Sequence, residues 1–103
     1  MVLAAIPAAV WAMQRPDSRT LDGVVRDSDG TPVKGAVVKL KNMKSLQIRS
    51  FYTSAQGEYR FHGLDKEVDF QVKADYQGRS SQTETISSFN ERANLTVDLM
   101  LEA

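Results

Sequence analysis

Between residues 21 and 101, apolar and polar side chains alternate with a period of two, and this alternation restricts the fold more than any other feature. In the clearest example, residues 94–101 read NLTVDLML, with every second position from Leu95 to Leu101 apolar. Successive side chains of a β-strand point to opposite faces of its sheet, so such a segment is predicted to be a strand with one buried face. Helical periodicity is absent from this part of the chain.

The same pattern recurs in six further segments, separated by turn-forming residues about every 8–12 positions. The predicted strands are residues 21–25, 36–41, 46–52, 59–61, 68–75, 81–87 and 94–101, of which 81–87 is polar and is expected at a sheet edge. Two sheets that each have one apolar face must cover each other. The sequence therefore predicts an all-β fold, a seven-stranded antiparallel β-sandwich.

Composition limits the classes of function. A chain of 103 residues supports one domain with one core. Its 13 basic and 13 acidic residues cancel, so no overall field favours nucleic acid or an anionic membrane. The absence of cysteine excludes disulfides, thiol catalysis and cysteine-ligated metals, and it leaves the cellular compartment open.

The N-terminal segment 1–14, MVLAAIPAAVWAMQ, contains no charged side chain. It is too short to cross a bilayer comfortably, since a spanning helix needs about 20 apolar residues. Two interpretations remain open: a secretory leader or its remnant, or an arm used in assembly. In the second, the candidate interface residues are Val2, Leu3, Ile6, Val10 and Trp11. Residues 15–20 are predicted to be a linker, and residues 21–103 the sandwich domain.

The stretch RDSDGTPVKG, residues 26–35, raises the question of a calcium loop. Such a loop needs glycine at its sixth position and glutamate at its twelfth. Counted from Asp27, these positions hold Pro32 and Val38, so the pattern fails. Because Asp27 and Gly30 favour turns and Pro32 ends strand pairing, we predict a corner without metal.

Three segments in order, GVVRDSDGTPVKGAVVKL, SAQGEYRFHGL and VDFQVKADYQG, resemble the carboxypeptidase regulatory-like domain. The resemblance covers about residues 21–101. It departs at Ala55–Gln56–Gly57, where the family usually has Asp before the glycine. It implies a transthyretin-like, Ig-like sandwich without catalytic activity, similar to small standalone bacterial members that are often exported.

The residue types used in catalysis also favour a non-catalytic protein. His62 is the only histidine and no G-x-S-x-G elbow surrounds any serine, which argues against metal sites and Ser–His–Asp catalysis. We expect His62 to be a structural, hydrogen-bonded residue at a strand end. Asp65, Glu67 and Asp69 are expected to be solvated. No cofactor is expected.

Five basic residues occur with no acidic residue between Gly30 and Gly57: Lys34, Lys39, Lys41, Lys44 and Arg49. Basic residues beside aromatic ones can hold single-stranded nucleic acid. We favour instead lysines on the outer faces of strands, which discourage aggregation or meet an acidic partner surface.

Asn94–Leu95–Thr96 is a glycosylation sequon, and alternation predicts that Asn94 points outward, so that a glycan could be attached. Two functions follow from the whole sequence. The first is a non-enzymatic structural or assembly protein of the cell envelope or exterior, for example a filament subunit that donates its N-terminal arm to a neighbour. The second is a monomeric secreted module that binds carbohydrate, peptide or a partner protein through its loops.

Overall fold

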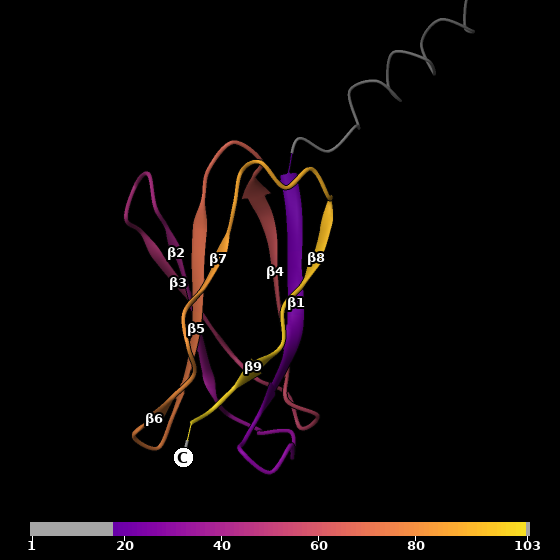
Figure 1. Ribbon diagram of the computed structural model, residues 1–103, viewed down its shortest axis with the longest axis vertical. Helices are drawn as coiled ribbons and strands as arrows, with labels where there is room; N and C mark the ends of the chain where they lie inside the picture. The colour runs from indigo at the N-terminus through magenta and orange to yellow at the C-terminus, as the bar shows by residue number, and fades with distance from the viewer. Residues whose placement is uncertain (1–17, 103) are drawn as a thin grey trace, which may run out of the picture.

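The computed structural model describes residues 18–102, and every regular element in this part of the chain is a β-strand (Figure 1). The strands are β1 (Ser18–Arg26), β2 (Val37–Asn42), β3 (Ile48–Tyr52), β4 (Glu58–Asp65), β5 (Phe70–Tyr76), β6 (Arg79–Ser80), β7 (Glu84–Ile86), β8 (Asn94–Thr96) and β9 (Leu99–Met100). The candidate arm residues Val2, Leu3, Ile6, Val10 and Trp11 lie outside the described residues.

The strands form two sheets, which confirms the β-sandwich. One sheet has the order β4-β1-β8, with β9 also paired to β1. The other has the order β3-β2-β5-β6, with β7 also paired to β5. Side chains from both sheets fill one core: Leu21, Val25, Val33, Ala36, Val38, Leu40, Tyr59, Phe61, Leu64, Val68, Phe70, Val72, Ala74, Ile86, Leu95, Leu99 and Leu101.

The last predicted strand is divided into β8 and β9, and both run parallel to β1. The division lies at Val97 and Asp98, where the chain interacts with groups of β1 and β4 in place of a regular ladder. The predicted strand 81–87 contains only β7, and the short strand β6 precedes it. The sandwich therefore has nine strand segments instead of seven, and two of its pairings are parallel, which the predicted antiparallel arrangement did not include.

β1 begins at Ser18, so the predicted linker 15–20 extends too far. The sequence predicted a linker because residues 15–20 are polar, but Arg19 is only 1% exposed and belongs to the strand. Its guanidinium donates to four backbone carbonyl oxygens, those of Ser87, Asn90, Asp65 and Val68, at 2.8–3.4 Å. A buried arginine without such acceptors would be strongly unfavourable.

The corner that follows β1 is confirmed as a turn. The Asp27 carboxylate accepts hydrogen bonds from the N–H groups of Asp29 and Thr31, at 2.9 and 3.0 Å. Gly30 has a φ of +87°, which glycine adopts without strain. The acidic side chain thus stabilises its own loop, and the bonded geometry accounts for the dense cluster of turn residues.

Two further boundaries differ from the prediction. Leu46 has a φ of +66° and lies in the turn before β3, so that strand begins at Ile48. The polar segment 81–87 does contain an edge strand, as predicted, because β7 pairs with no described strand except β5. No helix in the described part of the chain is long and apolar enough to cross a membrane.

Candidate interaction surfaces

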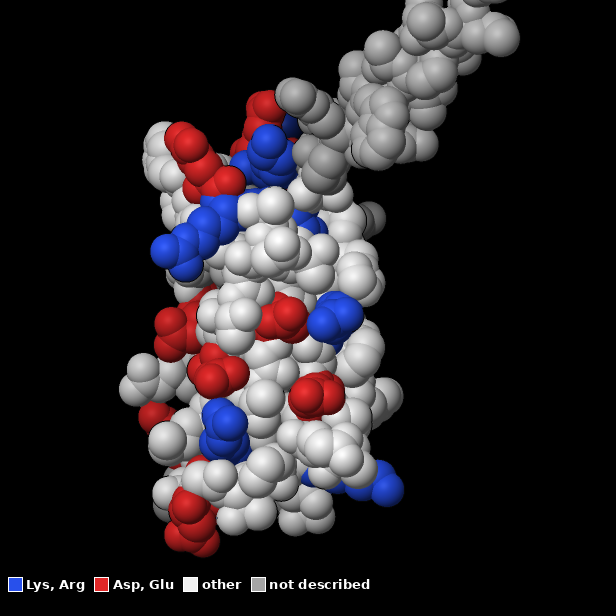
Figure 2. Space-filling model, turned by 90° about the vertical axis from the view of Figure 1, so that its right-hand side faces the viewer, with Lys and Arg blue, Asp and Glu red and all other residues white. Residues whose placement is uncertain are grey.

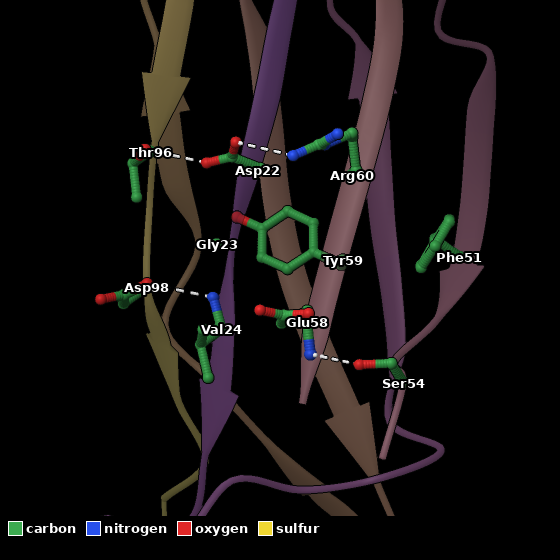
Figure 3. Close-up of a pocket in the computed structure, with 10 residues that line it drawn as sticks. All are labelled: Asp22, Gly23, Val24, Phe51, Ser54, Glu58, Tyr59, Arg60, Thr96 and Asp98. Carbon is green, nitrogen blue, oxygen red and sulfur yellow. Dashed lines mark hydrogen bonds and ion pairs between the residues drawn. The ribbon is translucent and has the colours of Figure 1, made fainter. Parts of the chain in front are cut away.

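A groove of about 500 Å³, lined by both polar and apolar groups, lies over β1, β4 and β8 (Figure 3). Its main lining consists of side chains that alternate with the buried residues of these strands. At its centre, the Asp22 carboxylate accepts a hydrogen bond from Thr96 Oγ1 at 2.8 Å and lies 3.7 Å from the Arg60 guanidinium. Asp98 accepts the N–H of Val24 at 3.0 Å. The charges of Asp22, Arg60 and Asp98 are thus compensated within the protein, the last by Arg26.

Tyr59 lies beneath this groove and is 1% exposed. Its hydroxyl donates to the carbonyl oxygen of Val97 at 2.6 Å. Burial, followed by the nearby charges of Asp98, Asp22 and Glu84, raises the pKa of Tyr59 well above its usual value. A phenol that keeps its proton and already donates it to the backbone is a structural group.

Acidic and basic side chains are intermingled on the face that bears β8, with no large field of one sign (Figure 2). Within residues 18–102, no group of three or more His, Cys, Asp or Glu side chains could hold a metal ion. The groove therefore offers hydrogen-bonding groups and no cluster of ligands for a cation.

The second surface is the outer edge of β3, here called the β3 edge. Among the described strands β3 pairs only with β2, and all five of its residues are exposed. Two hydrogen bonds, from the N–H of Asn42 to Gln47 O and from the N–H of Thr53 to Ala36 O, show which residues next to and within β3 direct their backbone groups towards β2. Antiparallel bonding alternates, so the backbone groups of residues 48, 50 and 52 point away from β2.

Apolar side chains accompany this free backbone. Ile48 is 58% exposed and Tyr52 is 70% exposed, with Leu46 at 60% beside them. Phe51, in contrast, turns towards the core and meets the Phe61 ring edge-on, with 6.1 Å between the ring centroids. An exposed apolar edge strand is a template for pairing with another strand.

A third feature lies on the outer face of β2 and β5. Lys39 and Lys73 are directly opposite in the ladder, and the Asp75 carboxylate lies 3.3 and 3.9 Å from their ammonium groups. The Ser80 hydroxyl donates to Asp75 at 2.5 Å and is the main reason that the pKa of Asp75 is lowered, with Lys39 next among the stabilising groups. The predicted outward position of Lys39 is confirmed.

The remaining predicted residues are on the surface. Asn94 is exposed at the start of β8, as predicted. His62 lies within β4, with its side chain exposed, instead of at a strand end. Its carbonyl oxygen accepts a hydrogen bond from Arg49 at 3.0 Å. The expectation of a structural imidazole at a strand end was thus wrong in position.

The β3 edge was not singled out from the sequence. A signal existed, because residues 46–52, LQIRSFY, have large apolar side chains on both faces of the predicted strand. A strand whose apolar residues do not keep one face cannot bury all of them in its own core.

A family model for the carboxypeptidase regulatory-like domain matches residues 20–102. The chain belongs to this family. The carboxypeptidase regulatory-like domain thus accounts for almost all of the described residues, and the resemblance in the sequence is confirmed. No curated protein matches the chain significantly.

Solved structures share the fold at low sequence identity. Chlorocatechol 1,2-dioxygenase from Pseudomonas putida is 14% identical with a TM-score of 0.63, over 87% of this chain and 63% of that one. The dioxygenase domain of a dioxygenase–carbohydrate-binding fusion from Streptomyces sp. SirexAA-E is 17% identical with a TM-score of 0.61, over 87% and 83%. A streptococcal ancillary pilin is 14% identical with a TM-score of 0.64, over 86% and 33%.

The chain spans less than two thirds of the chlorocatechol dioxygenase and a third of the pilin. At these identities the likeness establishes the Ig-like sandwich and nothing about activity.

Proposed function

We propose that this carboxypeptidase regulatory-like domain is a non-enzymatic assembly module of the cell envelope or exterior, and that it associates with further copies of itself through the β3 edge. The observation that carries the proposal is the outer backbone of β3, which no other strand of residues 18–102 pairs with and which the exposed side chains of Ile48 and Tyr52 border. An extended segment that adds to such an edge gains main-chain hydrogen bonds, and the alternate side chains determine which segment fits.

The proposed occupant is the N-terminal segment 1–14 of a neighbouring copy. It is uncharged, and its apolar residues Val2, Leu3 and Ile6 match the apolar border of the edge. Pro7 would interrupt part of a ladder, which limits the added strand to one side of it. Donation from one copy to the next is head-to-tail, so it would continue into a filament. That a streptococcal pilin has this fold is compatible with such a role.

A non-enzymatic role is supported by the chemistry of the described residues. The buried phenol of Tyr59 is bonded to the backbone, and the carboxylates of Asp22 and Asp98 are bonded within the protein. An enzyme would need a reactive group that is both free and positioned at its substrate.

The test measures mass by light scattering for four chains: full length, a deletion of residues 1–14, an edge variant and a control. The edge variant is Ile48→Lys with Tyr52→Lys. The control is Phe89→Lys with Met100→Lys, which removes two other exposed apolar side chains, 92% and 58% exposed. We expect large species for the full-length chain and the control, and monomers for the deletion and the edge variant.

A full-length chain that is monomeric at all concentrations contradicts the proposal and favours the second candidate, a monomeric secreted binding module. The groove over β1, β4 and β8 supports that candidate, since Asp22, Arg60 and Thr96 offer both donors and acceptors to a carbohydrate or peptide. Attachment of a glycan at Asn94, also a proposal, would appear as added mass in protein purified from its source.

A further inference from the structure

The first and last strands of the described domain lie side by side and point in the same direction. β1 pairs in parallel with β8, through Leu21 and Leu95, and with β9, through Val25 and Leu99. As a result, β1 begins at one end of the sandwich and the C-terminal segment finishes at the opposite end (Figure 1). A hairpin of antiparallel strands would instead place both chain ends together.

Backbone hydrogen bonds join β1 to this C-terminal segment along its whole length. Each is 2.8 Å long: Thr20 N–H to Ala93 O, Val97 N–H to Asp22 O, and Leu101 N–H to Arg26 O. Side chains add to the ladder, because Asp98 accepts the N–H of Val24 and lies 3.4 Å from Arg26. The hydroxyl of Tyr59 in β4 donates a hydrogen bond to the carbonyl oxygen of Val97 in the same segment.

Both ends of this ladder are also fastened to the rest of the domain. At the start of β1, the Arg19 guanidinium binds the carbonyls of Ser87 and Val68, which belong to segments preceding β8 and β5. After β9, the N–H of Glu102 donates to Ser80 in the second sheet at 3.0 Å. Neither end of the ladder can be peeled away without breaking these additional bonds.

We propose that the domain is a force-bearing link, in which β1 and the segment 93–101 form a mechanical clamp. Tension between the chain before Ser18 and the chain after Glu102 drives β1 and β8–β9 in opposite directions along their common axis. The hydrogen bonds between them are then loaded in shear and must fail together. If the same strands were pulled apart from one end, the bonds would fail one at a time. The clamp operates within a single molecule and goes beyond the proposed assembly.

The direct test compares two pulling directions in single-molecule force spectroscopy. In one, handles are attached to the two chain ends. In the other, one handle is attached at an Asp29→Cys substitution in the exposed corner after β1 and the other at the C-terminal end; the native chain has no cysteine to interfere. At equal loading rate, we expect the end-to-end unfolding force to be at least about twofold higher, because several bonds share the load.

A matched pair of variants tests the clamp itself. Asp98→Ala removes a carboxylate that accepts a hydrogen bond and pairs with a cation within the clamp. Asp75→Ala removes an equivalent carboxylate outside it. We expect Asp98→Ala to lower the end-to-end unfolding force more than the force from the Asp29 direction, in which its bonds break in turn and not together, and Asp75→Ala to leave both forces unchanged.

Equal forces in the two directions would overturn the proposal, as would equal losses for Asp98→Ala and Asp75→Ala. Since each measurement is made on one molecule, these outcomes are independent of whether residues 1–14 mediate assembly. Failure of the clamp and failure of the proposed function can therefore be distinguished.

Discussion

Gly23 shows how a single position can determine the path of a distant segment. A Cβ atom built at Gly23 would lie 1.8 Å from the carbonyl oxygen of Val97 and 2.9 Å from the Tyr59 ring. The chain between β8 and β9 therefore passes over Gly23 because glycine has no side chain there. Tyr59 completes the contact through its hydrogen bond to Val97.

Gly23→Ala is expected to lower the free energy of unfolding by about 3 kcal/mol or more, since the clash is with backbone and cannot be relieved by a rotamer change. Gly63→Ala is the control. This substitution adds a Cβ atom in β4, where no heavy atom lies within 4 Å of it. Because the φ of Gly63 is +70°, a loss of about 1 kcal/mol in the free energy of unfolding is still expected. Urea denaturation measures both. Equal losses would mean that the close approach at Gly23 is not rigid.

Tyr59 also predicts a dependence of stability on pH. Its pKa is raised in the folded state, so above about pH 10 the unfolded chain releases a phenolic proton that the folded chain retains. The contribution of Tyr59 is therefore complete below pH 10 and is lost as pH rises beyond it, by up to about 1.4 kcal/mol per pH unit.

Tyr59→Phe should lower the free energy of unfolding at pH 7 by about 1 kcal/mol, because one buried hydrogen bond is lost. It should also flatten the decline in stability above pH 10. Tyr52→Phe alters an exposed phenol and should do neither. A Tyr59→Phe protein with the unaltered alkaline slope would contradict the assignment.

At the scale of elements, β1 is the strand on which the architecture depends. It lies between β4 on one side and β8 and β9 on the other, and its pattern of burial alternates over all nine residues. Arg19 continues that alternation by placing a charged group in the interior, where carbonyl oxygens from two turns surround it. One side chain thus joins three segments of the chain.

Arg19→Met is expected to lower the free energy of unfolding by about 3 kcal/mol or more, because several buried carbonyls lose a charged donor at once. Arg19→Lys should recover part of this loss, since an ammonium can reach fewer acceptors. Arg92→Met, at an exposed position, should change stability by less than about 0.5 kcal/mol. Denaturant midpoints for the three variants provide the measurement, and a neutral Arg19→Met would refute the role assigned to the guanidinium.

At the scale of the whole molecule, the two sheets share one core and are linked at one end by the C-terminal segment. Leu99 pairs with β1, and two residues later Leu101 bridges to Ser81 beside the other sheet. The sheets are therefore covalently and sterically coupled, and neither can bury its apolar face without the other.

We expect a single cooperative unfolding transition, with calorimetric and van't Hoff enthalpies equal within error, since strands of both sheets contribute side chains to one core. Deleting residues 1–14 should leave the midpoint within a few degrees, because residues 18–102 form a core with side chains from both sheets. Two resolved transitions would instead mean that the sheets unfold independently.

The sequence determined the elements that depend on neighbouring residues. Alternation predicted the buried faces of β1, β2 and β5, and Asp27 with Gly30 predicted the corner, because strand faces and turns follow from the backbone conformation of a few adjacent residues. The same local motifs identified the family. These features required no knowledge of what each strand would meet.

Only the tertiary structure decided the parallel pairing of β1, the interior position of Arg19 and the exposure of the β3 edge. Each depends on groups far apart in the chain: the hydrogen bond between Val24 and Asp98 joins positions 74 residues apart, and the Arg19 bonds join positions 46–71 apart. Alternation indicates which face of a strand is apolar, but it does not indicate which strand lies beside it. Which strands become neighbours depends on how the two sheets pack over one core. That packing puts β1 beside β8 and β9 and leaves β3 at the edge of its sheet.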